Sequence, residues 1–275
     1  MKSLCIPYQG SKRKLAGKII DYIMDAAPET KYIYDLFGGG GAVSFAAIQH
    51  NKIKQVYYNE LNTGVVELLK DIIKNGVTDK YFQWIDRETF HAYKNDNDWF
   101  GGLLKTCWSF GNNQRTYLFG KDVEPIKKAA HEYLMLNGYD GTSKTRVRLV
   151  KEFKKKELIS GRFQLQQLEQ LQQLERLVIT NLSYEEVKIE TPVDETIIYL
   201  DPPYENTGKY QLHIDHNKLW NYVKNSKYKI IISSYDCHFT EVESFTHRCT
   251  IAAKNNNEVQ EKLFVNFQPK QRYLF

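Results

Sequence analysis

A run of four glycines, residues 38–41, constrains the fold of this 275-residue chain more than any other feature. It follows a short apolar segment at 32–37 with the composition of a buried strand, and it precedes a run of small residues at 42–50 that suits a helix. A second strand pattern at 55–59 and an amphipathic helix pattern at 61–74 come next. Strands that alternate with helices in this order predict an α/β domain with a parallel sheet covered by helices.

The strand patterns stop near residue 78, and polar, aromatic and basic residues then dominate until about residue 176. Apolar segments typical of strands resume at 177–182, 196–200, 229–235, 248–253 and 263–267. We therefore predict an α/β domain formed by residues 1–77 and 177–275, interrupted by a mostly helical insert at 78–176.

Helix patterns are also expected at 12–26 and 217–224. Between Leu165 and Leu177 a leucine recurs at every third residue among Gln and Glu. Because such a stripe winds around a helix, we interpret this stretch as a helix packed against several neighbours.

Composition excludes some classes of protein. The four cysteines form no C-x-x-C pair, which argues against a zinc site or a disulfide framework and indicates reduced thiols. His213, Asp215 and His216 have the composition of a polar loop before a helix, so we expect no metal.

No apolar N-terminal segment and no long apolar run occur, so we expect a cytoplasmic protein without a membrane span. The net charge of +5 is compatible with a nucleic-acid partner but is a weak indication by itself.

Two features indicate a cofactor that contains a nucleoside. A glycine loop between a strand and a helix lets the backbone approach a ligand closely, although Ser44 stands where the third glycine of G-x-G-x-x-G would be. Glu60 follows the second strand about 20 residues later, where an acidic side chain typically accepts hydrogen bonds from a ribose. These features do not distinguish a dinucleotide from S-adenosylmethionine.

The distinguishing feature is Asp201-Pro202-Pro203-Tyr204, which follows the apolar strand at 196–200. Two prolines form a stiff turn at the carboxyl end of a strand, where open α/β sheets bind ligands. The Asp201 carboxylate and the Pro202 carbonyl can accept both N–H bonds of an exocyclic amine, and Tyr204 can stack on its base. This arrangement suits attack of that amine on a sulfonium methyl group, with the base outside the duplex. A purely structural turn is disfavoured because a chance match to this pattern directly after a strand is rare.

The chain resembles the Dam-like (D12-class) DNA adenine methyltransferases, in particular their phage-type branch. Five segments are similar to family motifs in the family's order: Pro7-Tyr8-Gln9-Gly10-Ser11-Lys12, residues 35–43, Glu60-Leu61-Asn62, Ser233-Ser234-Tyr235-Asp236 and residues 258–263. Glu60 replaces the commoner Asp of the third motif. Cofactor motifs followed by an insert and then the catalytic turn are the family's α-type arrangement.

The resemblance implies a Rossmann-like sheet of an S-adenosylmethionine-dependent methyltransferase, with one antiparallel strand near its end and an inserted target-recognition domain. The implied catalytic residues are Asp201, Pro202, Pro203 and Tyr204. The implied cofactor contacts are Tyr8, Lys12, Asp35, Phe37, Gly39, Gly41, Glu60 and Asp201. The implied reaction is direct methyl transfer to N6 of a flipped-out adenine in double-stranded DNA, without a metal. A bacterial or phage-encoded monomer or weak dimer is expected, alone or within a restriction–modification system.

The insert matches the family only at the edges of its target-recognition region, in segments 107–113 and 117–121. Many relatives have a longer β-hairpin between these edges, so no recognition sequence is carried over. By their chemistry, Asn112, Asn113 and Arg115 are candidate base readers. Candidate phosphate contacts are the basic residues Lys144, Arg146, Arg148, Lys154 and Lys155. A solvated helix face is the alternative interpretation of that basic stretch.

Three other functions stay open at this point. The same turn can hold the amino group of cytosine, which gives an N4-cytosine methyltransferase. A nucleotide-dependent oxidoreductase is disfavoured by the broken glycine pattern and by the Asp201 turn. A catalytically silent DNA-binding module with the same fold is disfavoured by the presence of both Asp201 and Glu60.

Overall fold

The computed structural model describes residues 5–137, 173–203, 214–248 and 258–269. Its contacts divide the chain into two compact units. The sheet unit comprises Met1–Leu4, Lys12–Leu61 and Gln172–Phe275, and the helical unit comprises Cys5–Ser11 and Asn62–Leu171. The functional boundaries expected at residues 78 and 176 stay a prediction.

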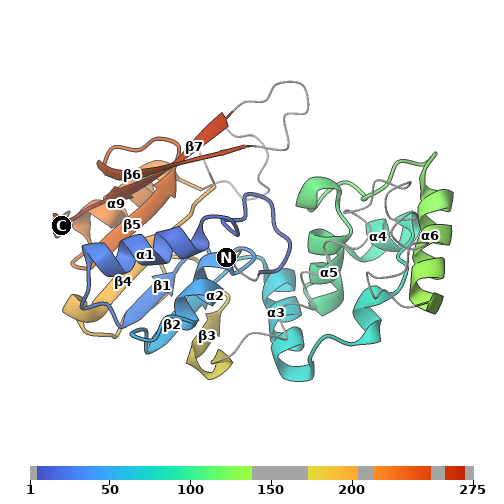
Figure 1. The fold of residues 1–275 in the computed structure, drawn as a ribbon, viewed down its shortest axis with the longest axis horizontal. Coiled ribbons are helices and arrows are strands. Elements are labelled where there is room, and N and C mark those ends of the chain that lie inside the picture. Colours follow the sequence, from blue (N-terminus) through green and yellow to red (C-terminus); the bar gives the residue numbers. More distant parts are fainter. Residues whose placement is uncertain (1–4, 138–172, 204–213, 249–257, 270–275) are drawn as a thin grey trace. The chain divides into compact units, whose positions relative to one another are not determined.

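The described part of the sheet unit forms a seven-stranded sheet in the order β3-β2-β1-β4-β5-β7-β6 (Figure 1). The strands are β1 Tyr32–Asp35, β2 Gln55–Asn59, β3 Leu177–Thr180, β4 Thr196–Leu200, β5 Lys229–Ser234, β6 Thr240–Arg248 and β7 Glu258–Val265. β7 pairs antiparallel with both β5 and β6, and the other neighbouring strands pair in parallel. One of the described strands therefore runs against the rest, as the family resemblance implied.

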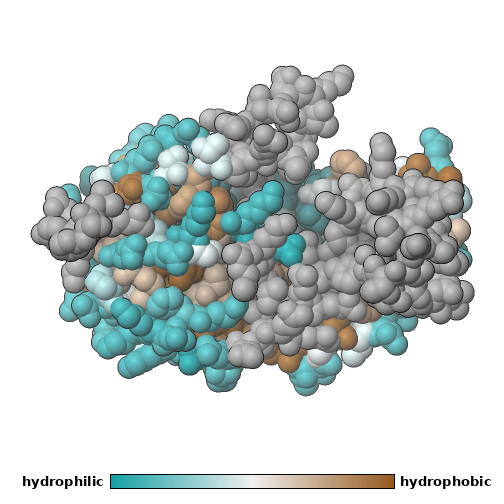
Figure 2. Space-filling view, in the orientation of Figure 1, coloured by the Kyte–Doolittle hydropathy of each residue, from teal (hydrophilic) through white to brown (hydrophobic). Residues whose placement is uncertain are grey.

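Helices cover both faces of this sheet, so its central strands consist mostly of apolar residues. β4 is buried at every position, as parallel strands covered on both sides are. Ile198 and Ile230 pack with Leu219 and Val223 of α9 (His216–Asn225) on one face. In Figure 1, α1 (Ala16–Ala26) lies in front of the sheet and α9 behind it, and α2 (Ala42–Ile48) packs against α1, β1 and β2. Hydrophilic residues predominate over the sheet unit in Figure 2, with hydrophobic areas between them.

The described part of the helical unit contains α3 Thr63–Asn75, α4 Arg87–Tyr93, α5 Trp99–Cys107 and α6 Glu124–Asn137, with the 3₁₀ turns η1 Asp79–Phe82 and η2 Phe110–Asn112. α3 and α5 approach closely because both carry glycine at the contact. A Cβ on Gly102 would lie 1.9 Å from the Gly64 carbonyl oxygen. Trp84 packs against Trp108 and Phe119, which gives this unit an aromatic core of its own. The described part of this unit is mostly helical, as the sequence predicted.

Two local predictions differ from the structure. β6 was not expected at 240–248, and of the strand expected at 248–253 only Arg248 is described, as the last residue of β6. The leucine repeat was interpreted as a helix through Leu177, but Leu174–Arg176 form a 3₁₀ turn (η3) and Leu177 begins β3. That interpretation is wrong for this end, where Leu177 pairs with Val56 of β2 and confirms the strand expected from residue 177. Residues 165–172 lie outside the described residues.

Candidate active site

The glycine loop that joins β1 to α2 is held in a conformation that requires glycine. Gly41 has φ +80° and is the N-cap residue of α2, and its amide donates to the Gly38 carbonyl at 2.7 Å. A Cβ on Gly41 would lie 2.7 Å from the Phe45 ring, and a Cβ on Gly38 would lie 2.3 Å from the Tyr58 ring. The loop therefore presents bare backbone at the carboxyl end of β1, as a cofactor loop requires.

A hydrogen bond to Glu60 connects this loop to the end of β2. The Gly39 amide donates to Glu60 Oε2 at 2.8 Å, and the Tyr58 hydroxyl donates to the Gly39 carbonyl at 2.7 Å. Glu60 is buried. The structure thus brings together two residues that the sequence predicted as cofactor contacts, Gly39 and Glu60.

Asp35, the last residue of β1, is a buried carboxyl at the same edge. One of its oxygens accepts a hydrogen bond from the Ser44 hydroxyl at 2.7 Å, and Oδ1 has no hydrogen-bond partner among the described residues. Burial raises the pKa of Asp35 to about 7, and repulsion from Asp201 and Glu60 adds to the rise that the Ser44 bond opposes. Ser44, which interrupts the glycine pattern, therefore has a role of its own as the partner of Asp35.

The Asp201 turn follows β4 directly, beside the end of β1. Lys12, which precedes α1, donates to Asp201 Oδ1 at 2.8 Å. The Lys12 side chain is 5% exposed and that of Asp201 is 19% exposed. Pro202 is buried and Pro203 is half-buried. Residue Tyr204 lies outside the described residues, so its expected stacking role stays a prediction.

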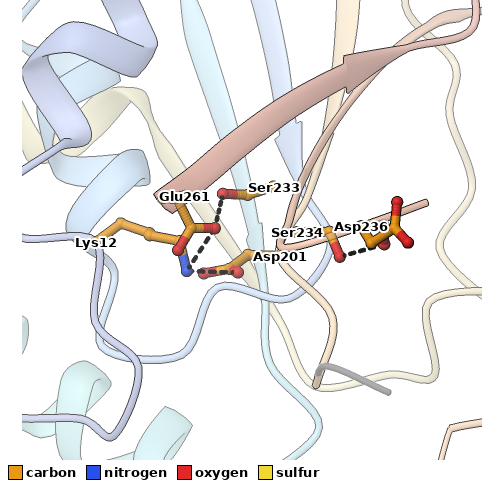
Figure 3. A network of polar contacts seen from close by, with 6 residues as sticks. All are labelled: Lys12, Asp201, Ser233, Ser234, Asp236 and Glu261. Atoms are coloured by element: carbon orange, nitrogen blue, oxygen red, sulfur yellow. Dashed lines mark hydrogen bonds and ion pairs between the residues drawn. The ribbon is translucent and has the colours of Figure 1, made fainter. Parts of the chain in front are cut away.

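A second carboxylate reaches Lys12 from β7. Glu261 Oε1 lies 3.6 Å from Lys12 Nζ and accepts a hydrogen bond of 2.8 Å from the hydroxyl of Ser233, on β5. Figure 3 shows the Lys12 ammonium in contact with both the Asp201 and the Glu261 carboxylates, and the Ser233 hydroxyl in contact with Glu261. Sequence reasoning included residues 258–263 only as a motif similarity, and it did not assign a role to Glu261.

A cavity of about 250 Å³ opens beside the Asp201 turn. It is lined from the ends of β1, β2, β3 and β4 and from the start of α9. The lining residues are Leu36, Phe37, Asn59, Leu61, Leu182, Ser183, Tyr184, Glu185, Pro203, Ile214, Asp215 and Lys218. Its walls combine aromatic and apolar faces with a few polar groups, which is typical of a small-molecule site.

Sequence reasoning missed the 182–185 wall of this cavity. The available signal was its position directly after the β3 strand, since ligands bind at the carboxyl ends of parallel strands. Phe37, an expected cofactor contact, does line the cavity. Tyr8, another expected contact, belongs to the helical unit and is half-buried there.

In the helical unit, the candidate base readers lie on a tight turn between Ser109 and Tyr117, which form an isolated antiparallel bridge. Asn113 Oδ1 accepts hydrogen bonds from the amides of Arg115 and Thr116, both at 2.9 Å, and the Asn112 side chain donates to the Thr106 carbonyl. In this state both asparagines therefore stabilise the turn. Arg115 is exposed, and its guanidinium makes no hydrogen bond or ion pair with the described residues.

The predicted phosphate contacts Lys144, Arg146, Arg148, Lys154 and Lys155 lie outside the described residues. Within the part of the chain that the structure describes, His, Cys, Asp and Glu side chains form no group of three or more suited to a metal ion. Over the same residues, every helix is too short or too polar to cross a bilayer.

Comparison with known proteins shows which family this chain belongs to. The family model of the D12 class N6 adenine-specific DNA methyltransferases matches residues 8–272. Among solved structures, a protein from Haemophilus influenzae described provisionally as a methylase is similar, with 12% sequence identity and a TM-score of 0.35 over 92% of this chain and 88% of that one. A search of curated proteins found no match.

Proposed function

Because this chain belongs to the D12 class of N6 adenine-specific DNA methyltransferases, we propose that it transfers a methyl group from S-adenosylmethionine to N6 of an adenine flipped out of double-stranded DNA. The observation that carries this proposal is the position of Asp201 at the carboxyl end of β4, next to β1 and its glycine loop. Methyl transfer requires the acceptor amine and the methyl donor to lie close together, and at this edge of the sheet the acceptor turn is next to the cofactor loop.

The residues at this edge fit S-adenosylmethionine. The bare backbone of the glycine loop and the Glu60 carboxylate suit the ribose region, and the cavity beside Phe37 and Tyr184 suits a purine ring. Asp35 Oδ1 is a buried acceptor without a hydrogen-bond donor among the described residues, which suits an ammonium group. The cofactor supplies an electrophilic methyl group on a positively charged sulfur.

In this proposal the chain's own groups orient the acceptor base. The Asp201 carboxylate and the Pro202 carbonyl accept the two N–H bonds of the adenine N6 amine, and Tyr204 stacks on the base. Lys12 contacts Asp201 through Oδ1 and so fixes the rotation of the carboxylate. The exocyclic amine is a poor nucleophile, so orientation and stabilisation of its developing charge are what the turn has to provide.

We assign DNA contact to residues 78–176, with double-stranded DNA as partner. Arg115 is the described residue best suited to this role, because its exposed guanidinium lies on the turn between the bridged residues Ser109 and Tyr117. Asn112 and Asn113 remain candidate readers if the turn rearranges on DNA. The basic residues at 144–155 are assigned to phosphate contacts by their charge alone.

The test of the proposed function is transfer of a labelled methyl group from S-adenosylmethionine to unmethylated double-stranded DNA, followed by nucleoside analysis. Label in N6-methyladenosine is the expected result, and it should disappear in the Asp201→Ala variant while cofactor binding survives. Label in N4-methylcytosine would establish the alternative acceptor. Absence of transfer by a folded protein that binds DNA would support the catalytically silent module.

A further inference from the structure

The Lys12 ammonium in the candidate site needs an explanation, because the proposed donor is itself a cation. Two carboxylates lie within salt-bridge distance of it, Asp201 at 2.8 Å and Glu261 at 3.6 Å. Both Lys12 and Glu261 are almost fully buried, with side chains 5% and 3% exposed. Charges in such a place interact strongly because little water screens them.

An ammonium beside Asp201 has two opposite consequences. It holds the carboxylate in place, but it also cancels the negative charge that would attract a sulfonium. A single Lys12–Asp201 pair would therefore present no net charge to the donor. With Glu261 included, this group of three described side chains has two carboxylates and one ammonium, so its own net charge is negative.

We propose that Glu261 is a positioning residue that offsets the charge of Lys12, so that Asp201 keeps its attraction for a positively charged methyl donor. The inference deepens the proposed function and rests on it. Glu261 does not need to touch the cofactor, because it acts through Lys12.

Strand pairing and a hydrogen bond hold Glu261 in this position. It lies on β7 opposite Phe245 of β6, and the Ser233 hydroxyl of β5 donates to its Oε1 at 2.8 Å. A residue that only anchored a strand would need no charge in a buried position, where an ion costs more than an amide. The neighbouring carboxyl of Asp35 also bears on the charge of the site, since it interacts electrostatically with Asp201.

The charge of Glu261 can be removed without changing its shape. Glu261→Gln keeps an oxygen that can accept the Ser233 bond and removes one negative charge. S-adenosylmethionine and S-adenosylhomocysteine form a matching pair of ligands, because they differ by one methyl group and by the positive charge on sulfur. A structural role would affect both ligands alike, whereas a charge role affects chiefly the sulfonium.

The experiment is calorimetric titration of both ligands into the wild-type protein and into Glu261→Gln. We expect affinity for S-adenosylmethionine to fall by about tenfold and affinity for S-adenosylhomocysteine to change by less than about twofold. The control is Glu241→Gln, which removes a carboxylate from an exposed ion pair with Lys262 on the same sheet and should leave both affinities unchanged. An equal loss for both ligands, or no loss for either, would overturn the inference.

A double variant separates this result from a folding defect. In Lys12→Met/Glu261→Gln the ammonium and its compensating charge are both absent, so the ratio of the two affinities should return toward the wild-type ratio. A ratio that stays as low as in Glu261→Gln would contradict a role through Lys12. If the wild-type protein fails to bind S-adenosylmethionine at all, the proposed function fails, and that result is distinct from failure of the inference.

Discussion

The Lys12 ammonium lies 2.8 Å from Asp201 Oδ1, although 189 residues separate the two in the chain. The pair joins the segment before α1 to the turn after β4, and it fixes the carboxylate assigned to the acceptor amine. Substitution of Asp201 should therefore affect methyl transfer, whereas substitution of Glu60 should affect chiefly cofactor binding.

Asp201→Asn should reduce the rate of methyl transfer by about 10²- to 10⁴-fold, because an amide is a weaker acceptor for the amine N–H and cannot offset developing positive charge. Single-turnover assays with saturating DNA and cofactor measure this step. The melting temperature should fall, because Lys12 loses a buried ion-pair partner, so the rate is compared at a temperature at which both proteins are folded. Retention of more than about half of the rate would remove Asp201 from the catalytic role.

Glu60→Ala should chiefly weaken cofactor binding, because it removes both the proposed ribose contact and the carboxylate that accepts from the Gly39 amide. We expect a loss of affinity of about tenfold or more, since hydrogen bonds to charged groups are worth about 1.5–3 kcal/mol. Calorimetric titration measures the change. Glu67→Ala serves as control, because Glu67 forms an exposed ion pair with Lys70. Unchanged affinity in Glu60→Ala would contradict the assignment.

Asp35 should make stability depend on pH. Its pKa is raised to about 7 in the folded protein, above the value of an unfolded Asp, so between about pH 4 and 7 the folded state binds more protons than the unfolded state. Stability should therefore fall as the pH rises through this window and level off above it. Asp35→Asn, which can keep an acceptor for Ser44, should lack this contribution. Urea denaturation at pH 5 and pH 8 compares the two proteins, and equal pH dependence would show that Asp35 titrates normally.

Gly41→Ala should distort the glycine loop, because Gly41 has φ +80° and the added Cβ would meet the Phe45 ring at 2.7 Å. A loss of stability of about 1–3 kcal/mol is expected, together with weaker cofactor binding. Gly17→Ala is the matched control. Gly17 lies within α1 with open space around it, so alanine there should stabilise the protein by about 0.5–1 kcal/mol. If both variants had the same effect, the loop conformation would not be what requires glycine.

Arg115→Ala should weaken DNA binding by about tenfold and reduce its salt dependence, without lowering the melting temperature. The reason is that its guanidinium is exposed and makes no hydrogen bond or ion pair with the described residues. Lys74→Ala is the control, because Lys74 is also an exposed cation of the helical unit but lies on α3. Fluorescence anisotropy at two salt concentrations measures both variants, and identical behaviour would remove Arg115 from the interface.

Much of the fold and part of the site follow from local sequence. The order of β1, the glycine loop, α2 and β2 is set by short-range patterns, so the parallel sheet was predicted correctly. The family, which the match over residues 8–272 establishes, was likewise recognisable from motifs. β6 was missed because its residues alternate polar and apolar types only weakly, and its pairing with β7 is what makes it a strand.

The sequence alone determined that Glu60 and Asp201 directly follow strands that their own apolar patterns define, whereas it extended the first strand to residue 37 and the structure ends β1 at Asp35. Only the tertiary structure decided that Lys12 lies between Asp201 and Glu261, and that residues 182–185 form one wall of the cavity. The physical reason is that strand patterns arise from neighbours in the chain, whereas buried ion pairs and cavity walls depend on which strands lie side by side, and long-range packing sets that order.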